Sequence, residues 1–294
     1  SVELIIDPEL VFSSYSGSTA DNFGSSATYD NTGHLYGGGT NFGAGYPTTL
    51  GAYSQPAAGN TDISISKFSP DGSSLIYSTF IGGSASEAVH SLIVNNNNEL
   101  CILGTSASQN YPTSVNCFQA VQNAGPAVNW DLSYGYGVVY SGGCDIVISK
   151  LSPDGSNLIA STYIGGTNND GLNPNTALYY NYGDPFRGEI NIDLANNIYV
   201  ASSTESTNFP ITAGAAQPTS GGGRDGIVFK MSSNLSTLAW STYIGGSSTD
   251  NAYCIQLNSN GECVVGGGTL SANFPTTSGS LNPTAGGLGD GWVA

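Results

Sequence analysis

The sequence predicts an all-β protein built as a β-propeller of four-stranded antiparallel blades. The segment 62–83 recurs as 145–166 and again as 225–246, and the chain ends at 290–294 inside a further copy. Each copy consists of short apolar strands separated by turn residues, and helical periodicity does not persist over ten residues anywhere. Four-stranded units that repeat at a fixed period without helices are typical of propellers, and a β-solenoid is the less favoured alternative.

The repeat is about 65 residues long. Pro47 and Pro112 are 65 positions apart, and Pro210 and Pro275 have the same spacing. Pro112 and Pro210 are instead 98 positions apart, so extra residues lie between them. We place these extra residues in two insertions, at 118–143 and 167–188. Residues 1–294 then form a single β-propeller domain or part of one, with about four blades' worth of strands, and we expect the chain to be a segment of a longer polypeptide.

Strand and turn signals support each unit. ISISKF and LIYSTFI in the first copy carry the β-branched and aromatic residues that strands favour, and Ser-Pro-Asp-Gly at 69–72 joins them as a turn. The third copy has Ser233, Asn234 and Leu235 in place of this turn sequence. The glycine pair at 82–83 and its repeats end a strand, where we expect backbone with positive φ.

Antiparallel alternation places both insertions on one face. We call the four strands of a unit A, B, C and D in chain order. The insertion at 118–143 then connects a B strand to a C strand, and the insertion at 167–188 connects the following D strand to the next A strand. These connections emerge from the same rim and flank one hairpin, so the insertions should be neighbours.

Composition excludes several classes of function. Five Lys and Arg residues oppose 21 Asp and Glu residues, which gives a net charge of −16 at pH 7 and leaves no basic cluster for nucleic acid. No apolar run reaches the ~18 residues of a membrane-spanning helix. The five cysteines and two histidines lack zinc-site spacing, and we expect His34 and His90 to be packing or surface residues. The sequence indicates no cofactor, metal or membrane span.

The repeat resembles a known family. The pattern D-x-x-[VI]-x-K-[FL]-S-P-D-G-S, followed by S-T-[YF]-I-G-G and then by [YF]-P-T-T, resembles the SBBP-type bacterial β-propeller repeat over nearly the whole chain outside the insertions. This resemblance implies an exported protein on the bacterial cell surface or outer membrane exterior, of the kind associated with type IX secretion, gliding motility and adhesion. It implies no catalytic residues, because the motif is structural.

The two insertions are rich in aromatic residues. Long loops on a rigid scaffold often carry recognition, and aromatic residues and Arg are enriched in binding hot spots. We therefore take the following residues as candidates for partner binding: Trp130, Tyr134, Tyr136, Tyr140, Tyr179, Tyr180, Tyr182, Phe186 and Arg187. The alternative is that the insertions pack on each other as a small core, and both roles are compatible.

Two cysteines lie at the ends of the first insertion. Cys117 and Cys144 are 27 positions apart, whereas the equivalent positions in an uninserted copy, Ala215 and Arg224, are nine apart. We predict a Cys117–Cys144 disulfide that closes this loop, which the loop-entropy model values at about 3 kcal/mol.

Lysine and aspartate also recur at fixed repeat positions. All three lysines of the chain share one position, where we expect each to pair with a nearby carboxylate or to protect a strand edge; they are Lys67, Lys150 and Lys230. The alternative is that they form a basic ring. An aspartate begins each C strand, where we expect it to accept backbone hydrogen bonds; these residues are Asp62, Asp145, Asp225 and Asp290. Calcium binding is the alternative for these aspartates, although they lack the spacing of an EF-hand loop.

These features favour a non-catalytic recognition module that binds a protein, or a glycan, through the face of the insertions. A glycan-processing enzyme is the alternative, and it would need paired carboxylates or a histidine-centred site. The only candidates for such a pair are Asp170, Asp184 and Glu189 near the second insertion.

Overall fold

The computed structural model describes residue 10 and residues 12–123, 125–131, 137–178 and 184–294. This part of the chain is all-β. Its only helical element is the single 3-10 turn η1 (Asp184–Phe186). Among the described residues, no helix has the length and hydrophobicity needed to cross a bilayer.

Four antiparallel sheets follow one another along the chain, and within each sheet neighbouring strands follow one another in chain order. Sheet 1 contains β1 (Asn22–Tyr29), β2 (Leu35–Asn41), β3 (Asp62–Phe68) and β4 (Leu75–Ile81). Sheet 2 contains β5 (Glu87–Val94), β6 (Leu100–Ser106), β9 (Asp145–Leu151) and β10 (Leu158–Ile164). Sheet 3 contains β11 (Glu189–Ile192), β12 (Ile198–Thr204), β13 (Asp225–Met231) and β14 (Leu238–Ile244). Sheet 4 contains β15 (Asp250–Leu257), β16 (Cys263–Thr269) and β17 (Asp290–Val293).

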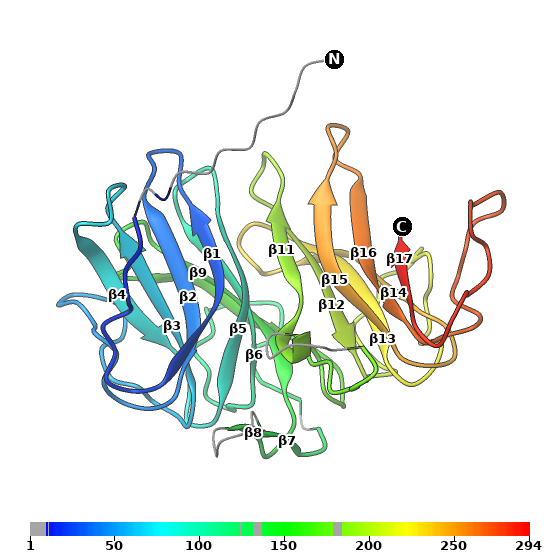
Figure 1. Cartoon of the computed structure of the whole chain (residues 1–294), viewed down its shortest axis with the longest axis horizontal. Helices are drawn as coiled ribbons and strands as arrows, with labels where there is room; N and C mark the ends of the chain where they lie inside the picture. Colours follow the sequence, from blue (N-terminus) through cyan, green and yellow to red (C-terminus); the bar gives the residue numbers. More distant parts are fainter. Residues whose placement is uncertain (1–9, 11, 124, 132–136, 179–183) are drawn as a thin grey trace.

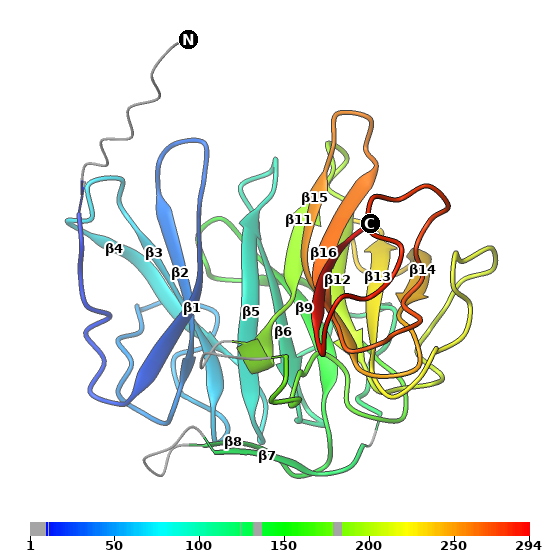
Figure 2. The same ribbon diagram turned by 45° about the vertical axis from the view of Figure 1, so that its right-hand side comes forward.

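The first strand of each sheet contacts the first strand of the next. Strand β1 packs on β5, β5 packs on β11, and β11 packs on β15. Figures 1 and 2 show these strands towards the middle of the molecule, with the later strands of sheets 1 and 3 farther out. Apolar residues between successive sheets form the core, as in the cluster that joins Ile148 of sheet 2 to Phe229 of sheet 3.

The turn between the third and fourth strands keeps its shape when its sequence changes. Gly72 and Gly155 adopt φ of 69° in sheets 1 and 2. In sheet 3 the same position is Leu235, which adopts φ of 59° and is completely buried. A left-handed backbone is unfavourable for a leucine, so burial of its side chain must offset the strain.

The glycine pairs at the ends of β4, β10 and β14 do not have the positive φ that we expected. The first position of each pair instead requires glycine because carboxylate oxygens lie close to its backbone. A Cβ on Gly82 would lie less than 3.0 Å from carboxylate oxygens of both Asp62 and Glu87, so no larger residue fits without displacing them.

Each recurrent lysine pairs with an acid, as predicted. Lys150 Nζ lies 2.7 Å from Glu99 Oε2 in sheet 2, and the two other lysines bind Asp30 and Asp193. These acids all lie in or beside the turn between the first and second strands of the same sheet. The lysines are therefore structural cations and do not form a basic ring.

The two insertions contact each other, as antiparallel alternation predicts. The first insertion forms the hairpin of β7 (Val128–Asp131) and β8 (Gly137–Tyr140). One apolar cluster joins Val138 and Tyr140 of this hairpin to Leu172 and Phe186 of the second insertion. The small core that we gave as an alternative role of the insertions is therefore present, and its hairpin lies at the lower edge of the molecule in Figure 1.

Candidate functional site

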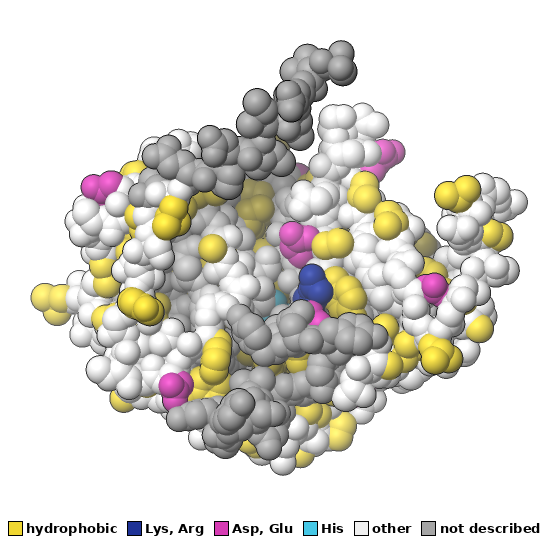
Figure 3. All heavy atoms as spheres, viewed as in Figure 1, with side chains coloured by type: hydrophobic (Ala, Val, Ile, Leu, Met, Phe, Trp, Pro, Cys, Tyr) yellow, Lys and Arg dark blue, Asp and Glu magenta, His cyan; other side chains and the backbone are white. Residues whose placement is uncertain are grey.

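A cavity of about 450 Å³ lies where the first strands of the four sheets meet. Its walls come from all four sheets and from the second insertion. They include Phe23, Ser25, Phe42, His90, Ser91, Asp184, Phe186, Arg187, Glu189 and Tyr253. Figure 3 shows the face on which basic and acidic side chains gather near the centre of the molecule. Aromatic walls with a few polar groups are the usual composition of a ligand pocket.

Arg187 is the charged group of this cavity most accessible to a ligand. Its Nη1 donates to Asp184 Oδ1 at 3.1 Å, and its guanidinium lies over the ring of Tyr253 at 5.3 Å. The side chain of Arg187 is still 54% exposed, so it can donate to a ligand without losing the ion pair. The prediction that Arg187 and Phe186 belong to the recognition surface is compatible with these positions.

Glu189 joins sheet 3 to sheet 4. Its Oε2 accepts the backbone N–H of Ile255 at 2.6 Å, which links β11 to β15. Glu189 and Asp184 line the same cavity, whereas Asp170 lies elsewhere, bonded to Thr204 and Ser206. Of the three acids considered for an enzyme, the fold therefore brings two together.

His90 is buried in the cavity wall. Its Nε2 lies 3.3 Å from Thr105 Oγ1, and Thr105 in turn bonds the hydroxyl of Tyr140 at 3.0 Å. Its Nδ1 has no hydrogen-bond partner. Desolvation lowers the pKa of His90 to about 3, so the imidazole is neutral at physiological pH. The prediction that His90 is a packing residue agrees with this burial.

Not all of the aromatic residues predicted to bind a partner can belong to a recognition surface. Tyr140 is completely buried under the hairpin, and burial raises its pKa well above the usual range. It is therefore a core residue and cannot contact a partner directly. Trp130 lies on β7 opposite Val138, but its side chain is not described. The remaining candidates lie outside the described residues; they are Tyr134, Tyr136, Tyr179, Tyr180 and Tyr182.

The predicted Cys117–Cys144 disulfide is not formed. Both cysteines are free thiols. Cys144 is buried in the cluster beneath the hairpin, where its backbone N–H donates to Asn169 Oδ1 at 3.1 Å. Cys117 belongs instead to a turn next to Phe118, whose N–H bonds the carbonyl of Leu235 in sheet 3. The two cysteines flank the loop in sequence, but the chain directs them towards different sheets.

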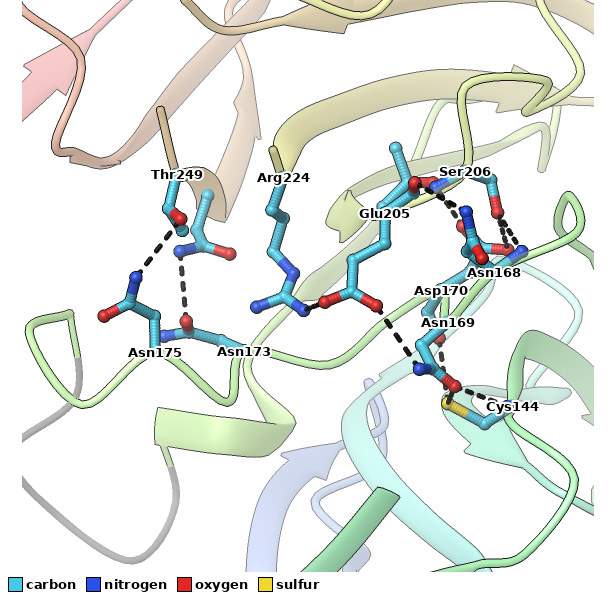
Figure 4. Close-up of polar contacts among 12 residues, drawn as sticks. Cys144, Asn168, Asn169, Asp170, Asn173, Asn175, Glu205, Ser206, Arg224 and Thr249 are labelled. Carbon is cyan, nitrogen blue, oxygen red and sulfur yellow. Dashed lines mark hydrogen bonds and ion pairs between the residues drawn. The ribbon is translucent and has the colours of Figure 1, made fainter. Parts of the chain in front are cut away.

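A polar network joins Arg224, Glu205 and Asn169 (Figure 4). Arg224 is only 4% exposed and forms an ion pair with Glu205. Glu205 Oε2 accepts Asn169 Nδ2 at 3.3 Å, so the network continues to the backbone of Cys144. Burial lowers the pKa of Arg224, and the nearby carboxylate of Glu205 opposes that effect.

A separate group of polar contacts reaches the cavity wall. Asn251 Nδ2 donates to Asn173 Oδ1 at 3.2 Å, and Asn173 Nδ2 lies 3.3 Å from the hydroxyl of Tyr253. Sequence reasoning treated Arg224 only as the repeat equivalent of Cys144. The sequence signal that could have singled out Arg224 is the rarity of basic residues, because the chain has only five Lys and Arg residues in total.

The recurrent aspartates accept backbone hydrogen bonds, as predicted. Oδ2 of Asp62 accepts the N–H groups of Ala58 and Gly59, and the other three copies accept equivalent bonds. Among the residues that the structure describes, no three His, Cys, Asp or Glu side chains converge as metal ligands.

No family model and no curated protein matches this sequence.

Proposed function

We propose that this chain is a non-catalytic recognition module of the β-propeller type, and that it works at the bacterial cell surface. The propeller assignment is supported by the neighbouring first strands β1, β5, β11 and β15 and by sheets in which neighbouring strands follow one another in chain order. The exported location is supported only by the resemblance of the repeat to SBBP-type sequences.

The observation that carries recognition is the central cavity. It opens where the two insertions meet the first strands, and it combines aromatic walls with the half-exposed Arg187. A projecting side chain or a sugar ring of a partner fits a pocket of this size and composition. We therefore place the partner, a protein of the cell surface, on the face that carries the insertions.

Photo-crosslinking tests this proposal. A photoreactive amino acid is placed at position 187, and the same amino acid is placed at Asp154 as the matched control. Asp154 lies in the turn between β9 and β10, at the end of these strands opposite both insertions. In cells that export the chain, position 187 should yield a discrete protein adduct that position 154 does not. Equal labelling from the two positions contradicts recognition by this face.

A glycan is the second candidate ligand. The cavity sets aromatic rings beside hydroxyl and carboxylate groups, which suit the apolar face and the hydroxyl groups of a sugar. Purified chain on a glycan array distinguishes this ligand from a protein. Binding that weakens about 30-fold in Arg187→Ala, the loss expected of a hot-spot residue, assigns the glycan to the cavity. Hydrolysis of the bound glycan, lost in Asp184→Asn, would instead favour the enzyme alternative.

A further inference from the structure

Pairs of buried carboxyl groups lie at all three junctions between successive sheets. At the first junction, Asp62 begins β3 of sheet 1 and Glu87 begins β5 of sheet 2, and both approach Gly82. The second junction brings Asp145 and Asp170 together at Gly165, and the third brings Asp225 and Asp250 together at Gly245. All six acids are at most 1% exposed. The arrangement therefore belongs to the repeat and is not an accident of one loop.

One oxygen at each junction has no partner. Oδ2 of each aspartate accepts N–H groups from the loop before its strand, whereas Oδ1 of Asp62, Asp145 and Asp225 accepts no hydrogen bond. The unpartnered oxygen is the one that lies closest to the glycine, which an oxygen of the second carboxylate also approaches. A buried carboxylate oxygen without a donor is costly, so a positive species at this position is physically favoured.

The protein supplies no positive side chain to these pairs. All five Lys and Arg residues of the chain are already paired with other acids. Those acids are Asp30, Glu99, Asp184, Glu205 and Asp193, and none of them belongs to a junction. Two buried carboxylates without a counter-charge must take up protons or bind a cation.

We propose that each junction binds one divalent cation, Ca²⁺, between the free Oδ1 of the aspartate and the second carboxylate of the pair, which is that of Glu87, Asp170 or Asp250. Ca²⁺ takes hard oxygen ligands at 2.3–2.6 Å and accepts backbone carbonyl, hydroxyl and water oxygens beside carboxylates. With only two carboxylates at a junction, those other oxygens complete its coordination. The three ions neutralise the junctions and tie each sheet to the next, which is a role separate from ligand recognition at the cavity.

Calcium titration of the full chain at pH 8 tests the proposal, because high pH removes protons that compete for the carboxylates. Equilibrium dialysis after treatment with a chelator should give about three Ca²⁺ per chain, and Ca²⁺ should raise the unfolding temperature. Asp62→Asn keeps an oxygen for the N–H groups of Ala58 and Gly59 but replaces the free carboxylate oxygen. It should bind one ion fewer and should be more stable than the wild type in the presence of chelator.

Asp290→Asn is the matched control. Asp290 occupies the same repeat position and bonds Gly286 and Gly287, but no second carboxylate of the described chain faces it. This variant should bind as many ions as the wild type. Two results overturn the proposal. The first is an unfolding temperature that does not change when Ca²⁺ is added at pH 8, which would mean that the carboxyl pairs take up protons instead. The second is a number of bound ions that Asp62→Asn does not lower.

Discussion

Arg224 at the start of β13 and Glu205 after β12 form an ion pair whose two partners differ in solvent access. The side chain of Arg224 is 4% exposed, whereas that of Glu205 is 31% exposed. Glu205 can therefore be hydrated when Arg224 is removed, but Arg224 cannot be hydrated when Glu205 is removed. The pair also connects sheet 3 to Asn169 of the second insertion.

We predict that Glu205→Gln destabilises the protein by about 3 kcal/mol, because it leaves a buried guanidinium without its counter-charge. Urea unfolding of the purified variant measures this loss. Asp154→Asn, in an exposed turn, is the control and should change stability by less than about 0.5 kcal/mol. A loss for Glu205→Gln as small as that of the control contradicts the structural role of the pair.

The left-handed Leu235 gives a second prediction. Leu235→Gly relieves about 1–2 kcal/mol of backbone strain but removes a completely buried side chain, whose loss costs about 2–5 kcal/mol. The net result should be destabilisation by about 2 kcal/mol in urea unfolding. Asn98→Gly, at a position with φ of 60° and no buried apolar side chain, should stay near wild type. If Leu235→Gly stabilises the protein, strain outweighs packing at this turn.

Glu87 predicts a pH dependence of stability. Burial raises its pKa from 4.5 to about 7. Because the pKa of Glu87 is higher in the folded state than in the unfolded state, protonation of its carboxyl group stabilises the folded protein. This stabilisation is complete below pH 4.5 and is lost as the pH rises through 7. In the presence of chelator, Glu87→Gln should therefore gain about 3 kcal/mol relative to wild type between pH 5 and pH 8.

The difference between variant and wild type is the quantity to follow, because other groups titrate in the same range. His90, with its pKa lowered to about 3, contributes stability above pH 6.5 and loses it as the pH falls. This effect is common to both proteins and cancels. The exposed Asn97→Ser is the control, and its difference from wild type should be flat because neither residue carries an ionisable group. A flat difference for Glu87→Gln shows that its carboxyl stays ionised in the folded protein.

The free cysteines give a prediction that needs no variant. Protein prepared without reductant and then unfolded should expose five reactive thiols, because all five cysteines are free. In the folded protein the buried Cys144 should react slowly, since burial raises its pKa well above the usual range. A count of three thiols on unfolding, with Cys117 and Cys144 found linked by peptide mapping, would restore the predicted disulfide.

Local patterns were sufficient to predict much of this architecture. Alternating strands, turn sequences, the pairing of Lys150 with an acid and the backbone bonds of Asp62 all depend on residues within one repeat unit. Antiparallel alternation also placed the two insertions together, because it depends only on strand order. The predicted disulfide failed because nearness to a loop in sequence does not determine which sheet a side chain packs against.

The sequence by itself determined the repeated sheets, because strand propensity, turn chemistry and period are properties of short segments. Only the tertiary structure decided which side chains meet between sheets. It buried Tyr140, brought Arg224 to Glu205 and formed the cavity beside Arg187. It also brought Asp62 and Glu87 together across a sheet boundary. Such contacts depend on how whole sheets pack, and the distance along the chain between their residues does not reveal them.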